Sequence, residues 1–159
     1  MLSHEQIIEY LDLKPLPIEG GYFRRTYLST DKLGSTRCLS SAIYYLLTPD
    51  TYSKLHCLPS DEIYHFYLGD PIELLLLDPS GVGKARQMGQ DILGGQVQQM
   101  LVPAHTWQGS RLCPGGEFAL LGTTMAPAFD ESDFTRPPSL NYLLEHYESD
   151  FHDLICQLF

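Results

Sequence analysis

The sequence has few basic residues and no long apolar segment. Ten lysines and arginines stand against 20 acidic residues, which gives a formal net charge of −10 at pH 7. Nucleic acids and anionic membrane surfaces attract cationic faces, and this chain offers no basic cluster larger than Arg24-Arg25. The longest apolar run, 72–77, is interrupted by Glu73 and is far shorter than the roughly 20 residues that cross a bilayer. We therefore expect neither a nucleic-acid partner nor a membrane partner.

Cysteine is scarce as well, and several catalytic motifs are missing. The four cysteines form no CxxC pair, so their spacing predicts no zinc site. The first residues are not cationic and no apolar stretch follows them, so we expect no secretory signal. These observations favour a cytoplasmic setting with free thiols. The sequence contains no GxSxG elbow, no HExxH motif and no glycine-rich phosphate loop.

The central part of the chain consists of short segments with the composition of β-strands. Aromatic and apolar residues alternate or cluster in them, and turn residues separate them at spacings of roughly 8–12 residues. This pattern is typical of an all-β sandwich or barrel. The predicted strands are 22–28, 39–47, 62–68, 72–77, 97–102 and 118–125, with shorter candidates at 52–57, 84–88 and 106–112.

Helices are predicted only near the two ends. Ser3 is a suitable N-cap with Gln6 as its capping-box partner, and Ile7, Ile8 and Leu11 then share one helix face. Over residues 139–158, apolar residues recur at three- and four-residue steps, which predicts an amphipathic helical segment. We expect it to cover the outside of the sheets or a second subunit. Residues 1–159 are thus predicted to form one domain.

Two segments concentrate side chains that bind metals or move protons. In the first, His56 is followed six positions later by Glu62, and then by Gly69 and a very apolar strand. The second runs from Gly94 to Gln108. Together they resemble the paired motifs of the cupin superfamily. Six phrases in chain order resemble its Cupin_5 (DUF985) family: EGGYFR at 19–24, SAIYYLL at 41–47, DEIYH at 61–65, GDPIEL at 69–74, VPAHTWQ at 102–108 and APAFD at 126–130.

The resemblance implies a double-stranded β-helix, the cupin jelly roll, in a commonly dimeric family of largely uncharacterised function. Metal-binding cupins use two histidines and a glutamate from the first motif and a histidine from the second. His56 and Glu62 match two of these positions, whereas Leu58 and Gln108 occupy the other two. Leucine offers no lone pair and glutamine offers only a neutral carbonyl. We therefore expect no tightly bound metal cofactor, which leaves room for a weakly bound divalent metal at His56 and Glu62.

The candidate catalytic residues are His56, Glu62 and Tyr64. If Glu62 faces into the barrel, desolvation raises its pKa and a neighbouring His56 opposes that rise. Such a pair suits proton transfer. We expect the four-residue turn after His56 to bring it next to Glu62 across one strand ladder, with Gln108 converging on both. The alternative is a fixed pair that only orders the strand entrance.

The candidate ligand-binding residues are Gln108, Arg24, Tyr45, His65 and Trp107. Arg24 would hold an anionic group in two hydrogen bonds, and the aromatic side chains would line a pocket for a planar or sugar ligand. Strand alternation places His65 on the opposite face from Glu62, so only a bulge would bring them together. His105 stands where the general cupin motif prefers glycine, which leaves the local backbone open.

Three functions are compatible with these features. The first is binding of a small polar ligand, sugar- or nucleotide-like, with isomerase or epimerase chemistry in which His56 is the base and Tyr45 or Tyr64 the acid. The second is a non-catalytic small-molecule binding module. The third is a metal-dependent oxygenase or isomerase, which the two lost ligand positions disfavour. We also expect a homodimer, because the aromatic strand 22–28 adds apolar surface that a small barrel cannot bury.

Overall fold

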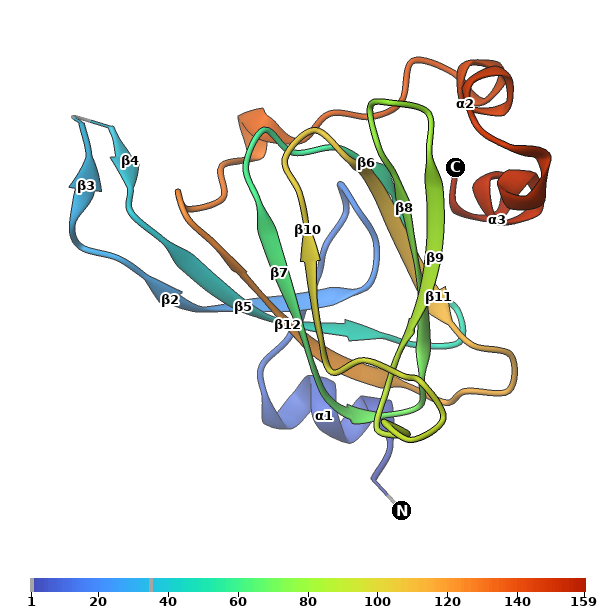
Figure 1. The fold of residues 1–159 in the computed structure, drawn as a ribbon. Helices are drawn as coiled ribbons and strands as arrows, with labels where there is room; N and C mark the ends of the chain where they lie inside the picture. The colour runs from blue at the N-terminus through green and yellow to red at the C-terminus, as the bar shows by residue number, and fades with distance from the viewer. Residues whose placement is uncertain (1, 35) are drawn as a thin grey trace.

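The structure is a computed structural model that describes residues 2–34 and 36–159. Strands dominate it, and helices occur near its two ends (Figure 1). In chain order the elements are α1 (His4–Tyr10), β1 (Lys14–Pro15), β2 (Tyr22–Leu28), β3 (Lys32–Leu33), β4 (Arg37–Cys38), β5 (Ser41–Leu47), β6 (Tyr52–His56), β7 (Glu62–Gly69), β8 (Ile72–Leu77), β9 (Gly83–Met88), β10 (Gln99–Val102), β11 (Trp107–Leu112), β12 (Ala119–Met125), the 3₁₀ helix η1 (Glu131–Asp133), α2 (Leu140–His146), the 3₁₀ helix η2 (Ser149–Phe151) and α3 (His152–Leu158).

Two sheets face each other and form the barrel. One has the strand order β1-β2-β5-β12-β7-β10 and the other β6-β11-β8-β9. From β5 to β12 the chain passes repeatedly from one sheet to the other, as a jelly roll requires. The predicted all-β jelly roll is therefore confirmed. Strand bounds differ from the prediction by one or two residues, because Leu39 and Val97 lie in the approaches to strands.

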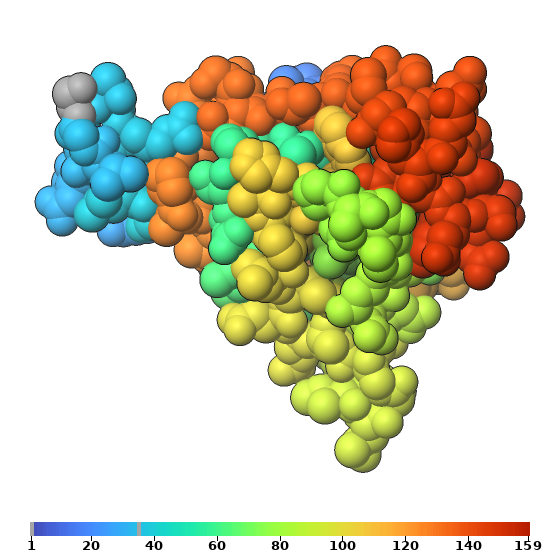
Figure 2. Space-filling model, turned by 45° about the horizontal axis from the view of Figure 1, so that its top comes forward, coloured from blue at the N-terminus to red at the C-terminus, as the bar shows by residue number. Residues whose placement is uncertain are grey.

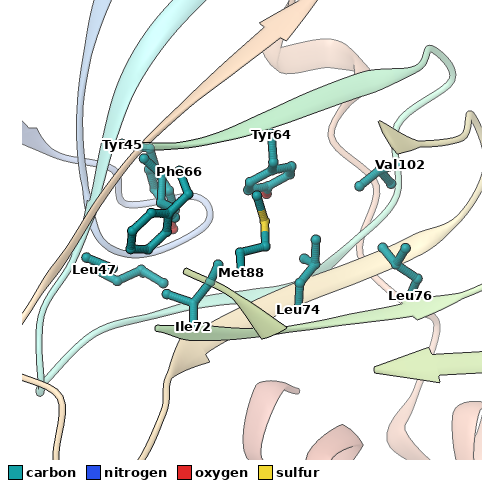
Figure 3. Packing of buried hydrophobic residues seen from close by; sticks show 11 residues of the cluster. Tyr45, Leu47, Tyr64, Phe66, Ile72, Leu74, Leu76, Met88 and Val102 are labelled. Atoms are coloured by element: carbon teal, nitrogen blue, oxygen red, sulfur yellow. The ribbon is translucent and has the colours of Figure 1, made fainter. Parts of the chain in front are cut away.

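A core of large apolar side chains runs along the space between the sheets (Figure 3). On β7 the alternation is as predicted: Glu62, Tyr64 and Phe66 are buried, whereas Ile63 and Tyr67 are exposed. The core residues are Tyr45, Leu47, Tyr64, Phe66, Ile72, Leu74, Leu76, Met88, Val102, Ala119 and Leu121.

The helices cover the outer faces of the two sheets. The capping box predicted for Ser3 and Gln6 is present at the start of α1, and Ile7 packs on the six-stranded sheet with Leu46 and Leu120. The segment predicted at 139–158 is divided into α2, η2 and α3, which pack on the outside of the four-stranded sheet. None of the helices within the described residues is long and apolar enough to cross a membrane.

A two-stranded arm projects from one side of the molecule, drawn in blue in Figures 1 and 2. It consists of the far ends of β2 and β5 and the hairpin β3–β4. Arg37 on β4 forms a bidentate ion pair with Asp133 of η1, which ties the arm to the body. Four apolar side chains of the arm are exposed to solvent: Tyr27, Leu28, Leu33 and Leu39.

Candidate functional site

A cavity of about 370 Å³ lies beside the apolar core, lined by residues of β2, β5 and β12, by the start of β7 and by the end of β6. The transition can be followed along the strands: on β5, Tyr45 belongs to the core and Ser41 and Ile43 line the cavity, and on β7, Tyr64 belongs to the core and Glu62 lines the cavity. The lining combines apolar walls with a few polar groups. It is formed by Leu16, Glu19, Phe23, Arg25, Ser41, Ile43, His56, Leu58, Glu62, Thr123, Met125, Phe129, Asp130 and Glu131.

His56 is the last residue of β6, and two contacts orient its imidazole ring. The ring stacks on Phe134 at a centroid distance of 4.6 Å and an interplanar angle of 15°. Its Nδ1 lies 2.7 Å from the carbonyl oxygen of Lys54. Because a carbonyl only accepts hydrogen bonds, Nδ1 carries the proton and the lone pair of the neutral ring is on Nε2. His56 therefore has the tautomer of a base that accepts a proton at Nε2.

Glu62 begins β7 and is nearly fully buried, with 6% of its surface exposed. The side-chain amide of Gln108 donates a hydrogen bond of 2.8 Å from Nε2 to Glu62 Oε2. Burial raises the pKa of the Glu62 carboxyl, and the nearby Glu19 carboxylate raises it further. His56, Thr123 and Gln108 favour the ionised form and limit that rise. The site thus holds a carboxyl group whose pKa is displaced toward neutrality.

The chain brings His56 and Glu62 to the same cavity in a different way from the one predicted. The two residues lie on different sheets, so the expectation that they neighbour each other across one ladder was wrong. The ladder partner of His56 is Gln108, on β11. The turn after β6 carries the chain over to the opposite sheet, so His56 and Glu62 line the same cavity from different sheets.

Tyr45 and Tyr64 lie in the core rather than in the cavity wall. Each is 1% exposed, and the Tyr45 hydroxyl donates a hydrogen bond of 3.0 Å to the carbonyl of Gly20. Burial raises the pKa of both phenols well above the usual range. The structure therefore does not place either tyrosine as the proton donor that the sequence suggested.

Arg24, His65 and Trp107 face away from the cavity, contrary to the roles expected of them. The guanidinium of Arg24 lies 5.7 Å from the ring centre of Tyr44 on the outer face of the six-stranded sheet. On the same face, His65 Nε2 lies 3.0 Å from the Thr124 hydroxyl. Trp107 packs against the cluster under the C-terminal helices. In each case the side chain follows strand alternation, and the next residue on β2, Arg25, lines the cavity instead of Arg24.

Glu19 is a cavity residue that the sequence reasoning missed. It precedes Gly20 and Gly21, which both adopt positive φ, at 118° and 68°. A Cβ atom at Gly20 would collide with the carbonyl of Tyr52, so the turn needs glycine there. Ser53 Oγ donates a hydrogen bond of 2.5 Å to Glu19 Oε1, which fixes the Glu19 side chain. The Glu-Gly-Gly phrase was the available signal, but it predicted only a turn.

The residues around His56 do not fit a tightly held transition metal. Within residues 2–34 and 36–159, no three histidine, cysteine, aspartate or glutamate side chains lie close enough to share an ion. The apolar side chain of Leu58 lines the cavity, and Gln108 directs its amide nitrogen, which is not a metal ligand, at Glu62. His105 adopts a φ of 64°, which explains why glycine suits that position.

Comparisons with known proteins agree with this architecture. The family described as Cupin superfamily (DUF985), Cupin_5, matches residues 5–136. An uncharacterised protein of Saccharomyces cerevisiae, YML079W, is 34% identical over 135 residues, which are 74% of this chain and 67% of the yeast protein. The crystal structure of protein SO0799 from Shewanella oneidensis shares 30% identity and a TM-score of 0.89, covering 99% of this chain and 98% of that one. A cupin 2 domain-containing protein from Halorhodospira halophila shares the fold, at 13% identity and a TM-score of 0.58 over 86% of this chain and 82% of that one.

Proposed function

The chain belongs to the Cupin_5 (DUF985) family of the cupin superfamily, and from this premise we propose that it binds a small polar organic molecule in its barrel cavity and moves a proton on it, as isomerases and epimerases do. The observation that carries the proposal is the pairing of His56 and Glu62 at the wall of one cavity. The two groups differ in kind: an imidazole with its lone pair on Nε2, and a carboxyl whose pKa burial raises. Such a pair can accept a proton on one side and return it on the other.

The surroundings hold both groups in place. The Phe134 ring and the Lys54 carbonyl fix the orientation of His56. Gln108 donates to one oxygen of Glu62, and a hydrogen bond from Thr123 also favours the ionised carboxyl. Side chains with fixed rotamers position reacting groups without the entropy loss that a flexible group would suffer in the transition state.

The apolar part of the wall accommodates the carbon skeleton of a ligand. Phe23, Ile43 and Met125 come from three neighbouring strands of the six-stranded sheet and line the cavity together with Phe129. A cavity of about 370 Å³ lies in the size range of small-molecule sites. Enclosure by these residues reduces the water around the reacting groups, which strengthens their electrostatic effect on a bound molecule.

The experiment is hydrogen–deuterium exchange on a panel of small hydroxy-carbonyl compounds, followed by NMR in heavy water. We expect the protein to catalyse exchange at the carbon next to the carbonyl of at least one compound. His56→Gln should slow this exchange by about 100-fold or more, the usual contribution of a general base. The matched control is His65→Gln, the same substitution on the outer face of the sheet, which should retain the wild-type rate.

Two outcomes would contradict the proposal. If His56→Gln exchanges protons as fast as the wild type, His56 is not the base. If a compound raises the unfolding temperature but undergoes no exchange in the wild-type protein, the cavity is a binding module without catalysis.

A further inference from the structure

The polar lining of the cavity is rich in hydrogen-bond acceptors, and its donors are the Ser41 and Thr123 hydroxyls and the Arg25 guanidinium. His56 presents the Nε2 lone pair, because its Nδ1 proton is donated to Lys54. Gln108 is 1% exposed, and its Oε1 has no hydrogen-bond partner among the described residues. Its amide nitrogen is already used on Glu62. Gln108 itself is not among the residues that line the cavity, so the unpartnered acceptor that a bound molecule can reach is His56 Nε2, on a side chain that is 1% exposed and to which no described residue donates.

The carboxylates add to this excess of acceptors. Glu19 and Glu62 enter the cavity from different places, the turn before β2 and the start of β7. Glu19 accepts a hydrogen bond from Ser53, and Glu62 accepts hydrogen bonds from Gln108 and Thr123. A carboxylate has about four acceptor sites, so each of the two groups can accept further donors. Their mutual repulsion is evident in the effect of Glu19 on the pKa of Glu62.

The net charge of the cavity lining is negative. Asp130 and Glu131 line the cavity on its solvent-exposed side, and Arg25 is the one arginine or lysine among the described lining residues. Four carboxyl groups thus stand against one guanidinium. Such a cavity attracts cations and repels carboxylates and phosphates. This argues against the nucleotide-like ligands considered from the sequence.

We infer that the ligand of this cavity carries a protonated primary amine, which enters between Glu19 and Glu62 and donates to their carboxylates. The inference rests on the proposed function, since it names the chemical class of the molecule that the cavity binds. An ammonium group has three donors and no acceptor, which complements this set of acceptors. The carbon skeleton next to the amine lies against Phe23 and Ile43. Amino sugars, whose open-chain form contains the carbonyl that the proposed proton transfer needs, fit this description.

The test uses three probes that differ only in the head group on one cyclohexane ring: cyclohexylammonium, cyclohexanol and cyclohexane carboxylate. Binding is followed through the NMR signals of the His56 ring at pH 7. We expect the ammonium to bind about tenfold or more tightly than the carboxylate, given one charge within a few ångströms of a carboxylate. Glu19→Gln should reduce the preference of ammonium over alcohol by several-fold. Glu145→Gln, on the exposed face of α2, is the matched control and should not change it.

The preference between two probes is measured on the same folded sample, so it does not depend on how stable a variant is. Binding of the carboxylate or the alcohol with equal or greater affinity than the ammonium would overturn the ligand class and leave the proposed function standing. An unchanged preference in Glu19→Gln would overturn the role of Glu19. If none of the three probes changes the His56 signals, the ligand class and the proposed binding function are both wrong.

Discussion

The hydrogen bond from Gln108 to Glu62 makes a sharp prediction about stability and pH. In Gln108→Leu, the buried Glu62 carboxyl loses its amide donor at 2.8 Å. A hydrogen bond to a charged group contributes about 1.5–3 kcal/mol, and one between neutral groups about 0.5–1.5 kcal/mol. We therefore expect the variant to lose about 1.5–3 kcal/mol of unfolding free energy at pH 7 and about half of that at acidic pH.

The sign of the pH dependence follows from linkage. The pKa of Glu62 is raised above 4.5 in the folded protein, chiefly by burial. The folded state therefore binds this proton more tightly, and the resulting stability is full below the unfolded pKa and is lost as pH rises through the folded pKa. Gln108 lowers the folded pKa, so its removal raises that pKa and widens the pH window over which stability is lost.

The assay is urea unfolding between pH 4 and pH 8, followed by the fluorescence of the single tryptophan, Trp107. Gln108→Leu is also measured in a Glu62→Gln background, which completes a double-mutant cycle. Because glutamine cannot ionise, the loss of unfolding free energy in Gln108→Leu should no longer depend on pH in this background. Gln99→Leu is the matched control on the outer face, where Gln99 lies 3.3 Å from His65. A loss that is the same at every pH, or equal in the control, would refute the reasoning.

Three further predictions concern metal binding, the turn before β2 and the arm. Leu58→His adds a histidine to the wall that His56 lines, so calorimetry should show tighter zinc binding than in the wild type; unchanged binding would contradict the account of the lost ligand position. Gly20→Ala should lower the free energy of unfolding by about 1–3 kcal/mol because of its positive φ, and further because the new Cβ collides with the Tyr52 carbonyl. Gly115→Ala also has a positive φ, but its Cβ meets nothing within 4 Å, so its loss should be smaller. Equal losses in chemical unfolding would contradict this. We propose that the exposed apolar arm makes the protein a homodimer, so light scattering should give a dimer mass that falls in Leu33→Glu; a wild-type monomer at micromolar concentrations would contradict it.

The sequence predicts the fold well because its signals are local. Turn residues mark the strand ends, and the period of two on β7 assigns Glu62, Tyr64 and Phe66 to one face. The capping box of α1 is a contact between residues three positions apart. These features depend on neighbouring residues, and they appear in the structure where they were predicted.

The site is harder to predict because it depends on long-range geometry. Alternation shows that Arg24 and Arg25 face opposite ways, but the absolute direction is set by the pairing of β2 with β5. Tyr64 faces inward as expected, yet its depth along the barrel decides between core and cavity. Glu19 reaches the cavity through a turn with two positive φ angles, which the Glu-Gly-Gly phrase permits but does not determine.

The central claim is that His56, Glu62 and Gln108 form a site for an organic ligand and not for a tightly held metal. Native mass spectrometry of protein purified without chelators, combined with elemental analysis, tests it most directly. We predict no stoichiometric transition metal, and any retained adduct should be a small amine-bearing molecule that Glu62→Ala releases. One iron, manganese or zinc ion per chain, lost in Glu62→Ala, would contradict the claim and favour a metal-dependent cupin reaction.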